Sequence, residues 1–352
     1  MITALNHTKT DKQNLTLLGF GFVLILVVLA SLSLGAFSIP FPHTLAILLD
    51  QIGIQLGTFE VQQSNVLLQI RFPRVLMAIL VGGGLGIAGA ALQGMFRNPL
   101  VEPGLIGVSS GAALFAVVFM VLVPVASSLA WIKPIGLPLF AFIGGLINVL
   151  AVYKLSKSQG RTDAATLILA GVAINALAGA LIGLVLFFAD DSALRSFTFW
   201  SLGDLGGATW SKIPVTLVLI IAPSILLLLN SKQLNALALG EQEAFHMGVN
   251  VQQVKLRLLI CGALIVGVGV SMAGMIGFVG LVVPHLIRIL FGADHRLVLP
   301  GSFLLGAILL NFADLIARVI VIPAEMPIGV ITALIGAPFF IWLIFNLNKS
   351  QY

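Results

Sequence analysis

Apolar residues fill most of the chain in long runs that charged residues or prolines interrupt. Because a helix needs about 20 apolar residues to cross a bilayer, runs of this length predict transmembrane helices. The expected spans cover residues 17–37, 66–94, 108–125, 134–153, 164–188, 212–229, 254–273, 279–291, 297–319 and 328–346. The eighth is too short to cross alone, so we expect it to be buried among its neighbours. The pattern predicts an all-α polytopic membrane protein with ten transmembrane helices.

One stretch, residues 71–107, combines features that organise the others. It opens with R-F-P-R (71–74), continues through an apolar run, and closes with R-N-P-L-V-E-P-G-L-I-G (97–107). Small residues recur at every fourth position of that run, at Gly82, Gly86, Ala90 and Gly94. Such a face lets a neighbouring helix approach closely, so we expect a packing seam here.

The composition supports a membrane protein. Only 9% of the 352 residues are charged and 59% are hydrophobic, whereas soluble domains carry about 25% charged residues. We expect one membrane domain, residues 17–347, between a polar N-terminal tail (1–16) and a short C-terminal tail (348–352). The first run is longer than the roughly 7–15 apolar residues of a signal peptide, which indicates an uncleaved first span. Cys261 is the only cysteine, so no disulfide forms within the chain.

Basic residues are unequally divided between the two sides of the membrane. An even number of spans places both termini on one side, and that side carries 12 Lys and Arg residues against 6 on the other, of 18 in total. The positive-inside rule therefore predicts that both termini are cytoplasmic. The net charge of +5 is scattered along loops, which argues against a nucleic-acid partner and leaves membrane lipid as the expected contact.

Two segments outside the spans have helical features of their own. Residues 189–211 carry aromatic side chains suited to a helix in the membrane interface. Residues 230–253 have apolar residues at helical spacing, broken at Gly240 and followed by a turn at Gly248. We expect a short helix pair there, and either a docking surface for a soluble partner or a capped connector fits this pattern.

Several kinds of chemistry are not indicated. The chain has no G-x-x-x-x-G-K-[ST] motif, so ATP would have to be hydrolysed by a partner. A G-x-G-x-x-G match at residues 84–89 lies inside a span and is better explained by helix packing. The histidines form no ligand pair, and His285, after Pro284, is expected to be a hydrogen-bonded structural residue. We predict no enzyme active site, no metal site and no cofactor.

Charged residues near the ends of two spans offer competing interpretations. Asp314 is the only acid within an expected span, which suggests a proton relay, but Arg318 lies four residues later on the same helical face and favours a structural ion pair. The arginines Arg71, Arg74 and Arg318 fit either snorkelling to lipid headgroups or sockets for carboxylates of a docking protein.

A series of motifs in a fixed order is similar to one known family over nearly the whole chain. They are R-F-P-R (71–74), N-P-L-V-E-P-G-L-I-G-V-S-S-G (98–111), L-A-L-G-E (237–241), G-F-V-G-L-V-V-P-H-L-I-R (277–288), D-H-R-L-V-L-P-G (294–301), A-D-L-I-A-R (313–318) and E-M-P-I-G-V-I-T-A-L-I-G-A-P-F-F-I-W-L (325–343). Together they resemble the FecCD-type permeases of binding-protein-dependent ABC importers for haem, ferric siderophores and cobalamin.

The resemblance implies a homodimeric type II importer in the bacterial inner membrane, with ten helices in each subunit. Two cytoplasmic ATPase subunits would dock on the loop 231–253, near Ala238, Leu239, Gly240 and Glu241. A periplasmic or lipid-anchored binding protein would place its acidic residues on Arg71, Arg74 and Arg318.

The resemblance also implies a cytoplasmic gate and a class of substrate. The gate would lie at Asn98, Pro99 and Leu100 and at the foot of the fifth helix, Asp163, Ala164 and Ala165. This chain lacks the hydroxyl residues of the cobalamin permease at that second place. The segment T-F-W-S-L-G-D-L-G-G-A-T-W (198–210) is more similar to the haem branch, although Asp204 stands where that branch has Ser. Haem is therefore favoured as cargo, with a ferric siderophore or cobalamin as alternatives. A proton-coupled secondary transporter is the alternative of another class.

Overall fold

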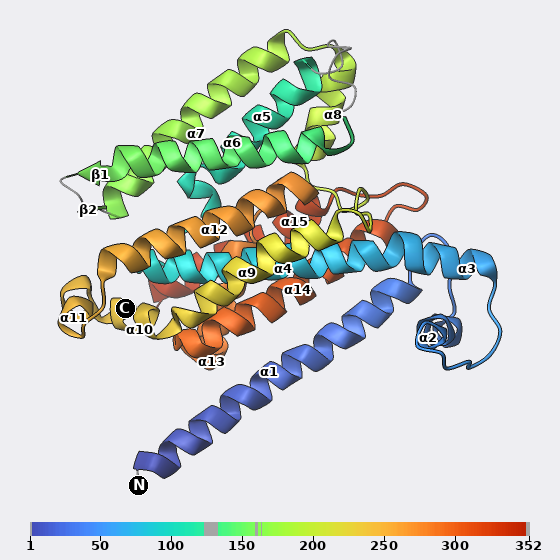
Figure 1. Ribbon diagram of the computed structural model, residues 1–352, viewed down its shortest axis with the longest axis horizontal. Coiled ribbons are helices and arrows are strands. Elements are labelled where there is room, and N and C mark those ends of the chain that lie inside the picture. Colours follow the sequence, from blue (N-terminus) through green and yellow to red (C-terminus); the bar gives the residue numbers. More distant parts are fainter. Residues whose placement is uncertain (1, 123–132, 159–160, 163, 350–352) are drawn as a thin grey trace.

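The computed structural model describes residues 2–122, 133–158, 161–162 and 164–349. The described chain is helical apart from one small hairpin (Figure 1). The long helices are α1 (Ile2–Ser33), α4 (Phe72–Phe96), α6 (Lys133–Ser156), α7 (Ala164–Phe187), α9 (Ile213–Leu229), α12 (Val251–Ala273), α14 (His295–Val319) and α15 (Ile328–Lys349). The shorter ones are α2 (Phe41–Asp50), α3 (Val61–Asn65), α5 (Val108–Leu122), α8 (Asp191–Ser201), α10 (Ser231–Leu239), α11 (Glu241–His246) and α13 (Val279–Phe291).

Three minor elements complete the described structure. A π-helix, η1 (Val66–Arg71), joins α3 to α4, and a 3-10 helix, η2 (Pro103–Ile106), precedes α5. The strands β1 (Lys157–Ser158) and β2 (Arg161–Thr162) pair antiparallel between α6 and α7. Nothing in the apolar pattern had predicted this hairpin.

The spans expected from hydropathy correspond to helices of different lengths. Six helices are long and apolar enough to cross a membrane, and α9 becomes a seventh if it is joined to α10 across a bend of 52°. The apolar helices α5, α13 and α15 are shorter in the part that the structure describes. The prediction of a helical membrane protein is thus confirmed, while the count of ten spans stays a prediction. The C-terminal end of the expected span 108–125 and residues 350–352 of the expected tail lie outside the described residues.

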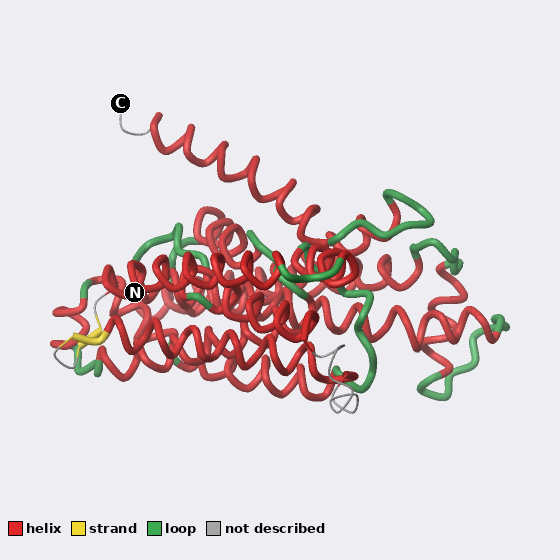
Figure 2. The backbone as a smooth tube through the Cα atoms, turned by 90° about the horizontal axis from the view of Figure 1, so that it is seen from above, coloured by secondary structure: helices red, strands yellow, loops and turns green. Residues whose placement is uncertain are grey.

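The centre of the bundle is α4, which packs against α9, α12, α13 and α14 (Figure 1). Its small-residue face meets α14 closely: a Cβ at Gly82 or Gly86 would collide with the backbone of Gly306 or Ser302. The predicted packing seam is therefore confirmed, and its partner is Gly306 on α14. The helices α5, α6 and α7 form a second group, which contacts the first through α12. Figure 2 shows α15 leaving the bundle toward the C-terminus.

Two segments enter the bundle as irregular chain. After α4, Arg97 takes a left-handed conformation (φ 51°) and the chain turns back toward the middle of α4. We call residues 97–107 the re-entrant segment. Residues 274–278 similarly connect the end of α12 to α13. The re-entrant segment and the start of α13 meet at Gly280, which packs against Pro103 and against the backbone of Leu85 in the middle of α4. Such irregular backbone is tolerated at membrane depth only when protein surrounds it.

The short helix α13 is fastened to α4 by buried polar groups. Pro284 has no N–H to give the Gly280 carbonyl, and Gln93 Nε2 donates to that oxygen at 3.3 Å. Arg288 donates to the Gln93 side-chain oxygen and, at 3.3 Å, to the Ala90 carbonyl. These bonds satisfy the freed carbonyl, as buried polar groups require. The expectation that the segment 279–291 is buried among neighbours agrees with its packing on α4, α14 and α15.

The two ends of the bundle differ in character. We call the end that holds Arg71, Arg74 and Arg318 the arginine end, and the opposite end, with α10 and α11, the coupling end. At the arginine end, α2, α3 and η1 enclose a small apolar cluster built on Ile39, Ile47 and Leu67 (Figure 1). This unit projects beyond the bundle and does not contribute to its core.

Candidate functional site

The coupling end carries a helix pair, as the spacing of residues 230–253 predicts. Gly240 separates α10 from α11 with φ +139°, and Gly248 ends the pair with φ +83°, both values that favour glycine. On α10, Leu234 and Leu237 are buried against the bundle, whereas Leu239 is 67% exposed. The pair therefore has an anchored face and an open face.

Asn235 fastens α10 to the start of α14. Its side-chain oxygen accepts the backbone N–H of His295 at 2.9 Å and lies 2.9 Å from His295 Nδ1. Its amide donates to Asp294 Oδ1 at 2.8 Å, and Asp294 caps α14 by accepting from the Arg296 N–H. Because His295 is almost fully buried, this hydrogen-bonded cluster holds α10 rigidly on the bundle.

Glu241 fastens α11 to α12. Its carboxylate lies 2.6 Å from the Lys255 ammonium, and the Lys255 side chain is only 9% exposed. A charge-assisted hydrogen bond of this length is stronger than a neutral one. The coupling end is therefore tied to both long helices that follow it in the chain.

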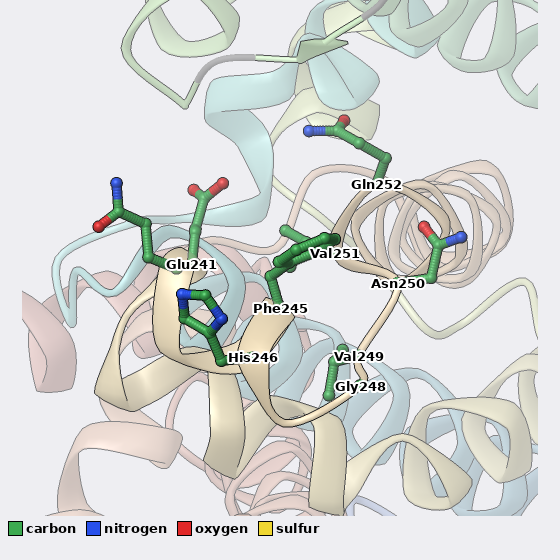
Figure 3. Close-up of a pocket in the computed structure, with 9 residues that line it drawn as sticks. Glu241, Phe245, His246, Gly248, Val249, Asn250, Val251 and Gln252 are labelled. Carbon is green, nitrogen blue, oxygen red and sulfur yellow. The ribbon is translucent and has the colours of Figure 1, made fainter.

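A hollow of about 1040 Å³ lies on the open face of the pair. In Figure 3, Glu241 and His246 lie on one side of it, Asn250 and Gln252 on the other, and Phe245 between them. Phe245 is 69% exposed, and Met247, next to His246, is 63% exposed. Exposed aromatic and methionine side chains within a polar rim are typical of protein–protein interfaces. The sequence analysis had not singled out Phe245 or Met247, although an apolar residue in a polar loop is a usable signal.

At the arginine end, a buried ion cluster joins α4 to α14. Arg74 Nε lies 2.8 Å from Asp314 Oδ1, and Arg318 Nε lies 2.9 Å from Asp314 Oδ2. Arg74 also contacts Glu325 at 2.8 Å. The expected pair Asp314–Arg318 is present in this geometry, but the closer partner, Arg74, had not been foreseen. Two guanidinium groups beside one fully buried carboxylate make a structural ion cluster, which argues against a proton relay through Asp314.

Arg71 and Arg318 close the end of α1. Arg71 donates to the carbonyl oxygens of Leu32 and Ser33 at 2.6 and 2.8 Å. Arg318 donates to the Ser31 carbonyl at 3.1 Å and to the Ser31 hydroxyl at 2.6 Å. The last carbonyls of a helix have no partners within it, and cations are favoured there. Both arginines therefore stabilise the packing of α1.

None of these three arginines presents a free guanidinium at the surface of the chain. Arg71, Arg74 and Arg318 are 4–6% exposed. Glu325 is the solvent-exposed member of the cluster, because its side chain is 48% exposed. Glu325 also lines a second hollow, of about 630 Å³, together with Trp200 on α8 and Met272 on α12.

The expected gate residues lie at the start of the re-entrant segment and of α7. Asn98, Pro99 and Leu100 are exposed, and the Asn98 side chain accepts the Leu100 N–H at 2.9 Å, which shapes a tight turn. Ala164 begins α7 and Ala165 is exposed, while Asp163 lies outside the described residues. Between these two groups, the described residues make no hydrogen bond or ion pair.

A polar cluster that the sequence analysis missed lies where α5, α6 and α7 meet. Ser110 donates to the Asn175 side-chain oxygen, and Asn148 donates to Ser110 at 3.4 Å. Asn175 also donates to the Gly104 carbonyl in the re-entrant segment at 3.3 Å. Both asparagines lie in apolar runs, and a polar residue in a span is by itself a functional signal.

The histidines have different surroundings from those expected. Within the described structure neither ring nitrogen of His285 has a hydrogen-bond partner. Its ring instead packs edge-on against Phe339 of α15 at 6.2 Å. The expectation that His285 is hydrogen-bonded is wrong, because its ring meets the aromatic side chain of Phe339. His43 and His295 are hydrogen-bonded instead, to the side chains of Gln63 and Asn235. Among the described residues, no group of three His, Cys, Asp or Glu side chains is placed to hold a metal ion.

The FecCD transport family model matches residues 23–346 of this chain. The chain is 47% identical to the hemin transport system permease protein HmuU of Yersinia pestis, over 94% of this chain and 96% of that protein. It is 38% identical to the vitamin B12 import system permease protein BtuC of Vibrio vulnificus, over 84% and 86%. A solved metal-chelate type ABC transporter in an inward-facing conformation is similar in fold, with a TM-score of 0.80 and 33% identity over 94% of this chain and 98% of that one.

The family match, the curated relatives and the solved structure all agree with the family resemblance that the sequence motifs indicate. They also agree with the absence of a nucleotide-binding motif, since in an ABC importer the ATPase is a separate subunit. The chain belongs to the FecCD transport family and is the membrane-spanning permease subunit of an ABC importer.

Proposed function

We propose that this permease imports haem across the bacterial inner membrane. The observation that carries the proposal is the 47% identity to a hemin permease over nearly the full length of both chains. Cobalamin permeases are 38–41% identical over 78–84% of this chain. The hollow at the arginine end supports the same choice, because Trp200, Phe199, Met272 and Met326 give it an apolar wall suited to a flat hydrophobic macrocycle.

The proposed assembly is a homodimer with two ATPase subunits on the cytoplasmic coupling end. In this proposal Ala238, Leu239, Gly240 and Glu241 lie at the ATPase contact, and Phe245 and Met247 are its apolar anchors. Movement of α11 reaches α12 through Glu241 and Lys255, and movement of α10 reaches α14 through Asn235. The two copies associate through α7 and α15, whose apolar faces are largely exposed in the single chain.

The arginine end is the proposed docking site of the binding protein, through Arg74. A carboxylate on that protein would replace Glu325 as the second partner of Arg74, while Asp314 remains the first. Arg71 and Arg318 would contribute indirectly, by fixing the end of α1 beside this site. This version differs from three open sockets because, of the three guanidinium groups, Arg74 is the one paired with a half-exposed carboxylate, that of Glu325.

The cytoplasmic gate in this proposal is formed by Asn98, Pro99 and Leu100 together with Ala164 and Ala165. In the homodimer these residues of the two copies would face a shared path. Both termini are placed in the cytoplasm, in keeping with the distribution of basic residues. A proton-coupled carrier finds no support in the geometry, because both oxygens of Asp314 face arginines.

Substrate competition tests the choice of cargo. The permease and its ATPase are reconstituted in liposomes with ATP inside and the binding protein outside, and uptake of haem is measured alone and against excess cobalamin or ferric siderophore. The proposal predicts haem uptake that neither competitor reduces. Uptake of cobalamin or of the siderophore in place of haem would contradict it while leaving the ABC importer assignment in place.

A further inference from the structure

A polar residue in the middle of α7, Asn175, attaches this helix to the re-entrant segment. Its side-chain amide donates to the Gly104 carbonyl oxygen in η2 at 3.3 Å. Gly171 lies one turn before Asn175 on the same face of α7, and a Cβ at this glycine would collide with the Leu105 carbonyl. A direct backbone contact and a side-chain hydrogen bond therefore hold the same two elements together.

A chain of hydrogen bonds fixes the orientation of the Asn175 side chain. Asn148 on α6 donates to the Ser110 hydroxyl of α5 at 3.4 Å, and Ser110 donates to the Asn175 side-chain oxygen. Because that oxygen is occupied as an acceptor, the amide group of Asn175 is the part that faces Gly104. Three helices thus direct one donor at the re-entrant segment, in a membrane domain where an unsatisfied polar group is costly.

The remainder of α7 is weakly held. Leu169, Val172 and Leu177 are 71%, 50% and 57% exposed. Within the described chain, α7 packs mainly on α5, α6 and η2 (Figure 1). Of these partners, η2 belongs to the chain that leads directly out of the central helix α4. The contacts at Asn175 and Gly171 are therefore a short route from α4 to α7.

Both elements that Asn175 joins carry residues of the proposed gate. Asn98, Pro99 and Leu100 lie in the re-entrant segment, and Ala164 and Ala165 begin α7. The described residues form no hydrogen bond or ion pair between these two groups, so the link lies deeper in the bundle, at η2.

The coupling end contacts α4 just before the re-entrant segment begins. The Leu234 side chain of α10 packs on Gly94, so closely that a Cβ at Gly94 would collide with it. Movement of α10 can therefore reach the re-entrant segment first, and α7 through it.

We propose that Asn175 is a positioning residue of the transport cycle, whose hydrogen bond to Gly104 latches α7 to the re-entrant segment so that the two parts of the gate move together. Asn175 does not bind cargo in this scheme. The proposal rests on the transport function and the gate proposed above, and it applies to any cargo of the importer.

Uptake measurements compare Asn175→Ala with Ser110→Ala in the reconstituted complex. Asn175→Ala removes the latch, whereas Ser110→Ala removes a neighbouring hydrogen bond of the same cluster and leaves the Asn175 amide in place. We expect N175A to lose about tenfold in uptake for each ATP hydrolysed, near the upper limit for one hydrogen bond, and S110A to stay within about twofold of the parent. Uptake by N175A that equals the parent's, or an equal loss in S110A, would overturn the proposal.

Thiol labelling separates a latch from a general defect in folding. In a Cys261→Ser background, single cysteines replace Leu100 in the re-entrant segment and Ala165 at the start of α7; both positions are exposed. ATP should change the labelling rate at both positions in the parent. When N175A is added, Leu100→Cys should keep its ATP response, because α10 still acts on α4, and Ala165→Cys should lose most of it. Equal responses at the two positions in N175A, whether retained or lost, would contradict the proposal.

This readout requires only ATP-driven movement, so it remains informative even if haem proves not to be the cargo. If N175A does not assemble, Asn175→Asp is used instead. Its carboxylate can still accept from Ser110 but has no hydrogen to donate to the Gly104 carbonyl, so the same loss of response is expected at Ala165→Cys. A full response at that position in N175D would contradict the latch.

Discussion

Arg74 and Asp314 lie 240 positions apart in the chain, yet Arg74 Nε is 2.8 Å from an Asp314 carboxylate oxygen inside the protein. Arg318 occupies the other oxygen of the same carboxylate, so one acid holds two helices at the arginine end. The cluster lies directly below the end of α1, which Arg71 and Arg318 close from the inside. It therefore has a structural role whatever docks above it.

Asp314→Asn should destabilise the permease strongly. The change leaves Arg318 without a carboxylate partner and Arg74 with only the half-exposed Glu325, and breaking a buried pair in this way costs about 3–5 kcal/mol. We expect a clearly lower unfolding temperature for the detergent-solubilised protein. Glu325→Gln, which alters only the half-exposed partner of Arg74, is the matched control and should change stability little. Equal unfolding temperatures for D314N and the parent would contradict a structural role for Asp314.

The same geometry changes how the docking of the binding protein should be tested. Arg71→Glu or Arg318→Glu would place a carboxylate against backbone carbonyl oxygens. A loss of uptake in these variants would therefore reflect damage to the fold and would not test docking.

Glu325→Ala is the sharper variant for docking. It removes the surface group that competes for Arg74, so we expect the binding protein to bind severalfold more tightly in a direct affinity measurement. Asp191→Ala, which removes an exposed acid of α8 at the same end, controls for net charge. Weaker binding of E325A than of the control would show that Arg74 is not the socket.

Phe245→Ala should weaken the complex with the ATPase without affecting the permease itself. Phe245 is exposed and makes no core contact, whereas an aromatic anchor at an interface contributes about 2 kcal/mol or more, which corresponds to about 30-fold or more in affinity. Co-purification and titration with the ATPase provide the measurement. Phe22→Ala, a comparably exposed phenylalanine on α1, should have no effect. If F245A binds the ATPase with normal affinity, Phe245 and the hollow beside it are not part of the ATPase contact.

Glu241 and Lys255 should behave as a unit in coupling. Either Glu241→Lys or Lys255→Glu places like charges together, and we expect severalfold less uptake for each ATP hydrolysed. The double exchange restores an opposite pair, so it should recover much of the loss in a double-mutant cycle. Additive losses in the double variant would indicate that each residue acts alone.

Gly82→Ala should separate α4 from α14. The added methyl would meet the Gly306 carbonyl directly, and overpacking of this kind costs about 1–3 kcal/mol. A lower unfolding temperature is the expected result. Gly19→Ala on α1, where the same methyl meets nothing, should leave the temperature unchanged or raise it slightly. Similar temperatures for the two variants would show that the seam tolerates repacking.

The amino-acid sequence predicts those parts of the fold that depend on local pattern. Apolar run length located the helices, the recurrence of Gly82 and Gly86 predicted a close helix contact, and Gly240 and Gly248 marked the ends of the short helices α10 and α11. Each of these features is determined by residues within a few turns of one another.

Contacts between distant segments were not predictable in the same way. Nothing in the spacing of Arg74 pairs it with Asp314, and nothing near Arg71 shows that it closes the end of α1. The re-entrant segment was missed because prolines and glycines punctuate it, a composition typical of a solvent-exposed loop. Its environment follows from the chain turning back into the bundle, which depends on Gly280 and Pro103 packing together.

The most direct test of the central claim is ATP hydrolysis and haem accumulation measured together in liposomes. The permease and its ATPase are reconstituted, and the binding protein is added empty or loaded with haem. The account predicts that the loaded binding protein stimulates hydrolysis and that haem accumulates only when ATP is present. Accumulation without ATP, driven by a proton gradient, or hydrolysis that no form of the binding protein alters, would contradict it.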